Sequence, residues 1–156
     1  MNMLQLSKKT LYAIESVIDI AYHAAGETVQ SREITRRQGI PRRYLEQALQ
    51  QLVRHGILLG VRGPRGGYRL ARERRRITVG DIVRVVAAAE PAGPNAADAV
   101  TDAGSELGRK VVRPLWGELQ AAMMASLDAI TIDELCARAG ATGIESEGRE
   151  HLDFSI

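Results

Sequence analysis

The sequence feature that most constrains the fold is a helix-turn-helix pattern followed at once by a Gly-rich hairpin pattern. Gly39 separates a short helical pattern, 31–38, from a longer one, 41–55, whose apolar side chains recur every three or four residues. Two short apolar runs then flank the turn Gly-Pro-Arg-Gly-Gly at 63–67 and predict a β-hairpin. Two helices and a hairpin in this order predict a winged helix-turn-helix domain, which we place at 1–90.

Hydroxyl side chains mark the starts of the other helices in this domain. Ser7 is suited to cap a helix of about 8–25, and Thr78 one that covers about 79–89. Ser31 is expected to cap the short helix before Gly39. Aromatic residues make up only 4% of the chain, so the core must be aliphatic. The predicted fold class is mainly α with a small β-hairpin wing.

The C-terminal half has a different composition. Pro, Gly, Asn and Asp interrupt any periodicity at 91–105, which predicts a linker. A long helix and a short terminal helix are expected within 106–140, with Pro114 either kinking the long helix or marking its start, and 141–156 is expected to be a disordered tail. An apolar stripe on the long helix is the expected dimer contact: Leu107, Val111, Leu115, Trp116, Leu119 and Met123.

Charge is divided sharply along the chain. Between Arg32 and Arg76 there are thirteen arginines and three glutamates, a net charge of +10, whereas the other residues hold 8 basic and 16 acidic side chains, a net of −8. The overall charge of +2 conceals this division. Arginine and lysine contacts with phosphate supply most non-specific affinity for nucleic acid, so the division favours a double-stranded DNA partner. The scarcity of aromatic residues disfavours base stacking on a sheet, as in binders of single-stranded RNA.

The first turns of the second helix of the motif should face the base edges. Arginine pairs with guanine, glutamine with adenine, and a glutamate such as Glu46 can accept from the amino group of cytosine. The alternative for Glu46 is a salt bridge to Arg42 or Arg43 one turn back. The residues expected to contact DNA are Lys8, Lys9, Arg32, Arg42, Arg43, Tyr44, Glu46, Gln47, Arg62, Arg65 and Gly66.

The hairpin turn carries Arg62 and Arg65 among three glycines. A turn of this kind lets the backbone approach DNA closely, and an arginine there can enter a narrow minor groove. A phosphate cradle for a nucleotide is the alternative, but the turn lacks the lysine and hydroxyl of a P-loop and does not open a helix.

Three joined motifs resemble the Rrf2 family of bacterial regulators. They are Gly-Ile-Pro-Arg-Arg-Tyr-Leu-Glu-Gln at 39–47, Val-Arg-Gly-Pro-Arg-Gly-Gly-Tyr-Arg-Leu-Ala at 61–71 and Ile-Thr-Val-Gly-Asp at 77–81. The similarity extends through Leu-Trp at 115–116 and Ile-Thr-Ile-Asp-Glu-Leu at 130–135. The resemblance implies a homodimer with a winged helix in each subunit, joined through the long helix and bound to an imperfect palindrome.

The resemblance also carries residue roles, and it exposes one departure. By position, Glu46 matches the family's major-groove glutamate and Arg62 its minor-groove arginine. Members that bind an iron–sulfur cluster have three cysteines in the segment equivalent to 91–110, where this chain has none. Arg113 stands where a histidine ligand would be expected, and an arginine cannot release its proton to bind iron. We therefore expect neither a two-iron two-sulfur cluster nor another cofactor.

The other candidate sensors are weak. Cys136 is the single cysteine, which excludes an internal disulfide, and its place on the apolar side of a helix favours packing. A redox role would need exposure and a lowered thiol pKa, or a bridge between two copies. His23, His55 and His151 lack the spacing of metal ligands.

These features favour a DNA-binding transcriptional repressor. The alternative is a regulator whose DNA binding depends on a small effector or partner protein bound at 91–113. An enzyme is not expected, because no nucleophile–base pair or cofactor motif is present. No stretch approaches 18 uninterrupted apolar residues and the first residues do not resemble a signal peptide, so a cytoplasmic protein without membrane contact is expected.

Overall fold

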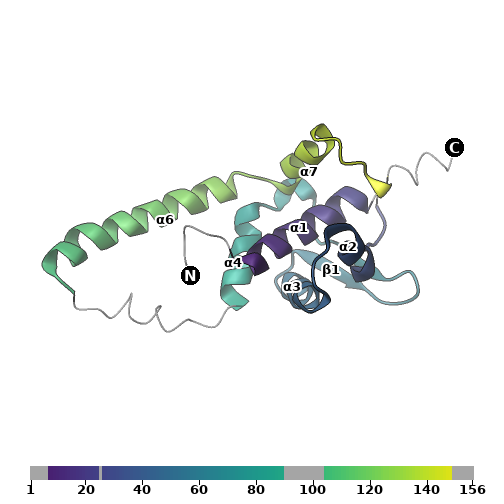
Figure 1. Ribbon diagram of the computed structural model, residues 1–156, viewed down its shortest axis with the longest axis horizontal. Coiled ribbons are helices and arrows are strands. Elements are labelled where there is room, and N and C mark those ends of the chain that lie inside the picture. The colour runs from purple at the N-terminus through teal and green to yellow at the C-terminus, as the bar shows by residue number, and fades with distance from the viewer. Residues whose placement is uncertain (1–6, 25, 90–103, 149–156) are drawn as a thin grey trace.

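A helical body carries a two-stranded hairpin, and one long helix projects away from it (Figure 1). The computed structural model describes residues 7–24, 26–89 and 104–148. The predicted linker at 91–105 lies almost wholly outside the described residues, as do residues 149–156 of the predicted tail. In chain order the elements are α1 (Lys8–His23), α2 (Ser31–Gln38), α3 (Arg42–Arg54), β1 (Leu58–Val61), β2 (Gly67–Leu70), the 3-10 turn η1 (Arg74–Arg76), α4 (Val79–Ala89), the π-helical turn η2 (Gly108–Val112), α6 (Arg113–Asp128) and α7 (Ile132–Ala141). The mainly α fold with a hairpin wing is confirmed.

Hydroxyl caps begin the helices at the predicted residues. The Ser7 side chain accepts from the backbone N–H of Thr10 at 3.2 Å, and Thr78 accepts from the N–H of Asp81 at 3.1 Å. Thr131 caps α7 in the same way. Each cap satisfies a backbone donor that has no partner within its own helix. Among the described helices, none is long and apolar enough to cross a membrane.

The cap of α2 differs from the prediction. Ser31 is the first helical residue, and Gln30 precedes it as the cap. The Glu33 carboxylate reaches back three residues and accepts from the Gln30 N–H at 2.7 Å, which forms a capping box. At the other end Gly39 has a φ of +67°, a left-handed conformation that glycine adopts without steric cost. This residue turns the chain from α2 into α3.

The core is aliphatic, as predicted, and α1 lies across its middle. The fully buried side chains come from α1, α2, α3, α4, α7 and the segments beside them: Ala13, Val17, Ile20, Ile34, Ile40, Leu45, Leu49, Leu58, Ile77, Ile82 and Ile132. Burying one such leucine or isoleucine contributes about 1.5–3 kcal/mol. Leu11 belongs to the apolar pattern of the first helix but is 43% exposed, because the buried face follows Ala13, Val17 and Ile20 instead.

The described part of the predicted tail, 141–148, is packed on the body rather than free. The Tyr22 hydroxyl donates to the carbonyl of Ile144, and the N–H of Glu147 donates to His23 Nδ1 at 3.1 Å. Acidic composition suggested a solvated segment. The structure shows that the Glu147 carboxylate binds Arg36 and Arg37 of α2. The described residues 141–148 are therefore ordered against the body, which differs from the expected disorder.

Candidate nucleic-acid interface

α3 separates into a buried stripe and an exposed face. Leu45, Leu49 and Leu52 are at most 1% exposed, which fixes the rotation of the helix on the body. The side chains expected to contact DNA therefore point outward together, and all of them are exposed: Arg42, Arg43, Tyr44, Glu46 and Gln47. An exposed, polar N-terminal half is the arrangement that lets a recognition helix enter the major groove.

Glu46 forms the salt bridge that the sequence left as an alternative. Arg42 Nε donates to Glu46 Oε1 at 2.9 Å across one helical turn, with the two side chains 84% and 51% exposed. An exposed pair at this spacing contributes only about 0.3–0.5 kcal/mol, so a base edge or a phosphate can compete for either partner. The salt bridge therefore does not exclude a contact between Glu46 and a base edge.

The wing is an antiparallel hairpin that is tied to the segment between α1 and α2. Its register pairs Leu58 with Leu70 and Val61 with Gly67. Val29 exchanges two backbone hydrogen bonds with Tyr68, at 2.8 and 2.9 Å. These bonds hold the wing beside the N-terminal end of α2.

Two adjacent glycines allow this close packing of the wing. A Cβ at Gly67 would lie 2.6 Å from the carbonyl oxygen of Val29, and one at Gly66 would lie 2.3 Å from that of Val61. Gly66 is also buried, and its N–H donates to Gly63 at 2.8 Å. Gly66 was predicted to contact DNA. The tight packing of the wing turn is by itself a reason for a glycine at this position.

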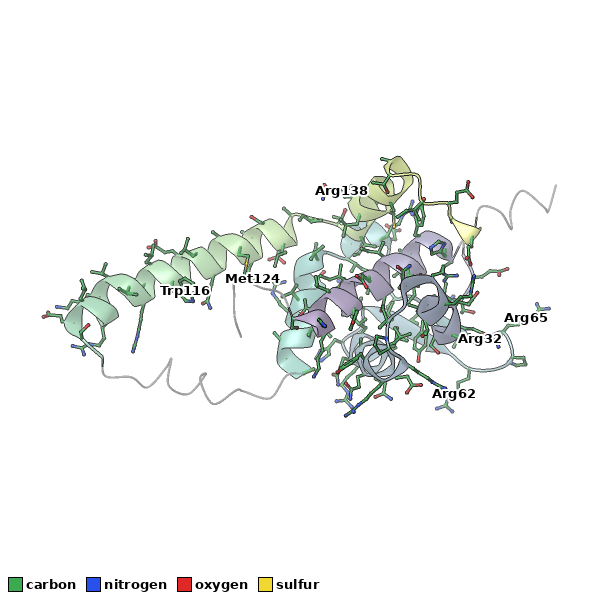
Figure 2. The ribbon with its side chains drawn as sticks, viewed as in Figure 1. Arg32, Arg62, Arg65, Trp116, Met124 and Arg138 are labelled. Atoms are coloured by element: carbon green, nitrogen blue, oxygen red, sulfur yellow. The ribbon has the colours of Figure 1, made fainter. Side chains whose placement is uncertain are left out.

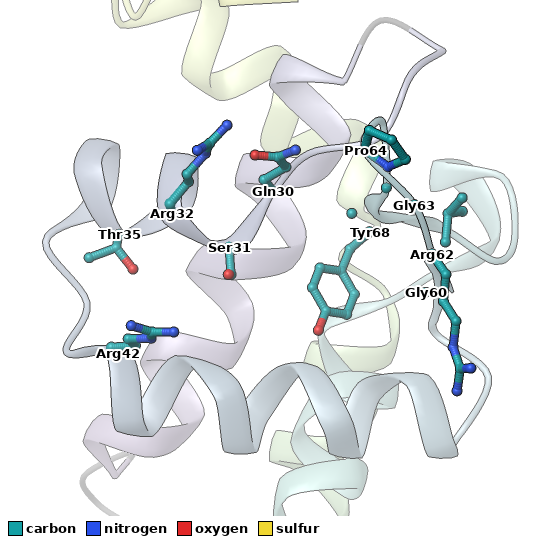
Figure 3. A pocket seen from close by; sticks show the side chains of 13 residues that line it. Gln30, Ser31, Arg32, Thr35, Arg42, Gly60, Arg62, Gly63, Pro64 and Tyr68 are labelled. Carbon is teal, nitrogen blue, oxygen red and sulfur yellow. The ribbon is translucent and has the colours of Figure 1, made fainter.

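A groove of about 920 Å³ opens between the wing and the starts of α2 and α3. Arg32 and Arg42 lie on one side of it, and Arg62 and Tyr68 lie on the wing (Figure 3). Arg32, Arg62 and Arg65 gather at the side of the molecule away from α6 (Figure 2). Amide and hydroxyl groups complete the lining: Gln30, Ser31 and Thr35. This density of donors suits an extended anion such as a phosphate backbone.

On the side of the groove away from the wing, three polar lining residues were not predicted from the sequence: Gln30, Ser31 and Thr35. Ser31 and Thr35 lie one turn apart on α2, a spacing that could have shown that they share a face. Gln30 reaches the groove only because the wing docks beside it, and no local pattern signals that contact.

The arginines of the basic stretch have different surroundings. Within the described chain no carboxylate forms an ion pair with Arg32, Arg43, Arg62 or Arg65. We call these four the DNA-facing arginines after the contact that the sequence predicts for them. All four are exposed. They remain available to phosphate and base edges.

Arg37, by contrast, is part of the core of the body. Its guanidinium donates to both oxygens of Asp19, at 2.7 and 2.9 Å, and to Glu147 at 2.6 Å. Only 9% of the Arg37 side chain and none of the Asp19 side chain is exposed. The hydrogen bond to Asp19 raises the pKa of Arg37 above its already high ordinary value. This arginine serves folding.

Other arginines of the stretch pair with carboxylates that lie outside it. The ion pairs are Arg36–Glu147 at 3.0 Å, Arg74–Asp133 at 2.7 Å and Arg72–Asp81 at 3.7 Å. The net charge of +10 in the sequence therefore overstates the charge that faces a ligand.

The structure brings one of the two N-terminal lysines to the recognition helix. Lys9 lines a cavity of about 370 Å³ together with Tyr44 and Gln47 of α3 and Val86 of α4. Lys8 is exposed at the start of α1, one residue earlier. Both remain predicted DNA contacts.

Cys136 lies in the core and is only 5% exposed. Burial raises the pKa of its thiol, against a smaller opposing effect of Arg74. A buried, protonated thiol reacts slowly, which favours the packing role over the redox one. No group of three or more histidine, cysteine and acidic side chains that could hold a metal ion is present among the described residues.

The apolar stripe on the long helix has no cover among the residues that the structure describes. None of the described side chains of α6 is buried. The residues predicted for dimerisation are 36–65% exposed: Leu107, Val111, Leu115, Trp116, Leu119 and Met123. Pro114 has no N–H that could donate to the carbonyl of Lys110. In the turn before it, the N–H of Arg113 donates to the carbonyl of Gly108, five residues back. Of the two expectations for Pro114, a kink or a helix start, the structure has α6 begin at Arg113, directly after the π-helical turn.

Comparison with known proteins places these features in one family. The family model Rrf2, described as an iron-dependent transcriptional regulator, matches residues 6–138. The HTH-type transcriptional regulator IscR of Vibrio atlanticus (strain LGP32) is 31% identical over 153 residues, which cover 98% of this chain and 86% of that protein. The solved structure of T. potens IscR has a TM-score of 0.72 at 31% identity and covers 92% of this chain and 94% of that one.

A second solved structure is similar in fold. CymR, the global cysteine regulator of B. subtilis, has a TM-score of 0.69 at 28% identity, covering 87% of this chain and 98% of that one. The relatives are named as regulators rather than enzymes, which agrees with the prediction that this chain is not an enzyme.

Proposed function

Because the chain belongs to the Rrf2 family of DNA-binding transcriptional regulators, we propose that it is a homodimeric repressor that reads a palindromic operator. The observation that carries this proposal is the groove between the wing and α2–α3, which is lined by two of the DNA-facing arginines, Arg32 and Arg62. Neither has a carboxylate partner among the described residues. We further propose that the protein acts in the bacterial cytoplasm, where its DNA partner lies.

Each part of the surface has a role in the proposed complex. The N-terminal half of α3 enters the major groove, where Glu46 accepts from a cytosine amino group once DNA displaces it from Arg42. Arg62 on the wing reaches an adjacent narrow minor groove, and Arg32 contacts the phosphates between the two. Specific binding then depends on α3, and most of the affinity depends on the arginines.

The apolar stripe of α6 supports a homodimer. An exposed row of leucine, valine, tryptophan and methionine over several turns is unfavourable in water and becomes buried when a second copy covers it. Two copies related by a twofold axis present two recognition helices to half-sites about 34–36 Å apart, or a multiple of that distance. A single exchange on the stripe, Leu119→Glu, should convert the dimer to a monomer in sedimentation experiments while the helical content is kept.

The side chains present do not fit the iron–sulfur cluster that the resemblance implies for the cluster-binding members of the family. A two-iron two-sulfur cluster needs four ligands, commonly cysteine thiolates. The chain has one cysteine, Cys136, and the core buries it. Arg113 stands where the resemblance expects a histidine ligand. We therefore propose that operator binding does not depend on a cluster.

Control by an effector or a partner protein is the second candidate. The observation that favours it is the π-helical turn at 108–112, which lies in the candidate segment 91–113 and exposes Val111 and Val112. Such turns are frequent at functional sites. Deletion of 92–104 should abolish regulation in the native host if this segment receives a signal, and unchanged regulation would remove the candidate.

The experiment that tests the proposed function is selection of genomic DNA fragments by the purified protein, followed by sequencing. We expect one discrete palindrome from the wild type, and loss of that motif with Glu46→Ala and with Arg62→Ala. Arg138→Ala is the matched control, because Arg138 is an exposed arginine on α7 that pairs with Glu134. Recovery of the same motif by all variants would contradict the assigned surface. Lower expression of the neighbouring genes after deletion of the regulator would contradict repression.

A further inference from the structure

Among the described residues, the long helix α6 meets the body at its C-terminal end (Figure 1). Its C-terminal end packs on α4, and a short antiparallel backbone bridge continues the contact beyond it. The N–H of Val79 donates to Ile130 at 2.9 Å, and the N–H of Ile132 donates to Ile77 at 2.9 Å. The direction in which α6 leaves the body is therefore decided at this junction.

A bidentate ion pair closes the junction. Arg84, on the exposed side of α4, donates through Nη1 to Asp128 Oδ1 at 2.8 Å and through Nη2 to Oδ2 at 2.5 Å. Asp128 is the last residue of α6. Two parallel hydrogen bonds fix orientation as well as distance, so this pair restrains the tilt of α6 on α4.

Gly80 permits the approach of the two helices. A Cβ at this position would lie 1.9 Å from Asp128 Oδ1 and 3.1 Å from the backbone nitrogen of the same residue. Gly80 is buried in the first turn of α4, where a glycine costs about 0.5–1 kcal/mol relative to alanine. The close seat of Asp128 is the structural reason for a glycine there.

We propose that Gly80, Arg84 and Asp128 form a joint that fixes the angle of α6 to the body and so determines the half-site spacing that the dimer accepts. The proposal rests on the homodimer proposed above. If the stripe of α6 joins the two subunits, the angle at this joint helps to set the position of each recognition helix relative to the twofold axis.

The length of the helix makes the angle important. Helical residues 106–128 extend over roughly 34 Å at 1.5 Å per residue. A tilt of about 10° moves the far end by about 6 Å, close to two base steps of roughly 3.4 Å. A small change at the joint therefore moves one recognition helix out of register with its half-site, although its own surface is unchanged.

The test compares two kinds of duplex that carry the motif recovered by genomic selection. One carries a single half-site, and the other is a series of palindromes whose spacing is shortened or lengthened by one or two base pairs. Fluorescence anisotropy of the full chain measures affinity for each. The variants are Gly80→Ala, Asp128→Ala and the charge exchange Arg84→Asp with Asp128→Arg. Gly117→Ala is the control, because a Cβ at Gly117 on α6 meets open space.

We expect Gly80→Ala and Asp128→Ala to bind the half-site within about twofold of wild type and the native palindrome about tenfold more weakly, a change of about 1.4 kcal/mol. Their preference among spacings should flatten, and the charge exchange should restore part of it. A wild-type spacing preference in both variants would overturn the joint, as would equal losses on the half-site and the palindrome. A wild-type protein that bound half-sites and palindromes alike would instead overturn the homodimer, and the joint with it.

Discussion

Two arginine-rich regions of the molecule lie close together and have opposite surroundings. Around Arg37, carboxylates from α1 and from the C-terminal segment surround the guanidinium, and the Arg37 and Asp19 side chains are almost fully buried. Around the groove, the DNA-facing arginines are exposed and form no ion pair with a described residue. In the first region, carboxylates of the fold neutralise the guanidinium charge. In the second region, the guanidinium charges are exposed and can bind an anionic partner.

The difference shows that a run of arginines in a sequence is not one functional unit. The carboxylates that neutralise Arg37 lie 18 and 110 residues away in the chain. A count of local charge cannot include them. Only the fold separates arginines that stabilise the body from arginines that are available to DNA.

Removal of the Arg37 side chain from the first region should cause the largest change, a loss of folding stability. Arg37→Ala leaves the Asp19 carboxylate buried without its bidentate partner, and it should lower the free energy of unfolding by about 3–5 kcal/mol. Chemical denaturation followed by circular dichroism measures this. Arg138→Ala, which removes one exposed pair, should change stability by no more than about 0.5 kcal/mol. Similar stabilities for the two variants would show that the Arg37 site contributes no more to the fold than an exposed ion pair does.

A smaller effect should come from the second region, on binding instead of stability. Arg62→Ala removes one exposed side chain on the wing, so the unfolding transition should stay where it is. Affinity for the selected operator should fall by about 1–3 kcal/mol, and discrimination at one position should relax. Anisotropy titrations measure both quantities. Loss of stability without loss of affinity would mean that Arg62 stabilises the fold and does not contact DNA.

The smallest expected effect is a pH dependence of the first region. Burial lowers the pKa of His23, against the opposing influence of Asp19, and Nδ1 accepts the N–H of Glu147 only when it is unprotonated. The stabilising contribution is therefore complete above the unfolded pKa of about 6.5 and is lost as the pH falls through the lower folded value.

Denaturation midpoints at several pH values test this dependence. The replacement His23→Gln keeps an acceptor without a titrating group, so the midpoint of that variant should fall less between neutral and mildly acid pH than the wild-type midpoint. The exposed His55 offers a control at His55→Gln. An equal fall for the wild type and His23→Gln would contradict the role of the imidazole.

The winged helix-turn-helix could be predicted because its signals are local. Gly39, the 63–67 turn, and the caps Ser7 and Thr78 each act within a few residues, and the structure has them where the patterns expected them. The cap of α2 was misplaced by one residue, since the pattern could not show that Glu33 would close a box on Gln30 in preference to a Ser31 cap.

Features that depend on distant contacts could not be predicted in the same way. The C-terminal segment looked solvated because its carboxylates have no local partner, yet Glu147 binds Arg36 and Arg37. No local pattern indicates that Gly80 lies against Asp128. Both features depend on contacts between segments that lie far apart in the sequence.

The salt dependence of operator affinity should separate the two arginine regions when it is measured for two variants of equal charge. One replaces the DNA-facing arginines by glutamine: Arg32, Arg43, Arg62 and Arg65. The other replaces exposed arginines that are paired with carboxylates: Arg36, Arg72, Arg74 and Arg138.

Each phosphate contact that is lost should reduce the slope of log affinity against log salt by about 0.9. We predict a large reduction for the first variant and a slope close to wild type for the second. Equal reductions would mean that affinity follows net charge alone, and that the groove between the wing and α2–α3 is not the DNA-binding surface.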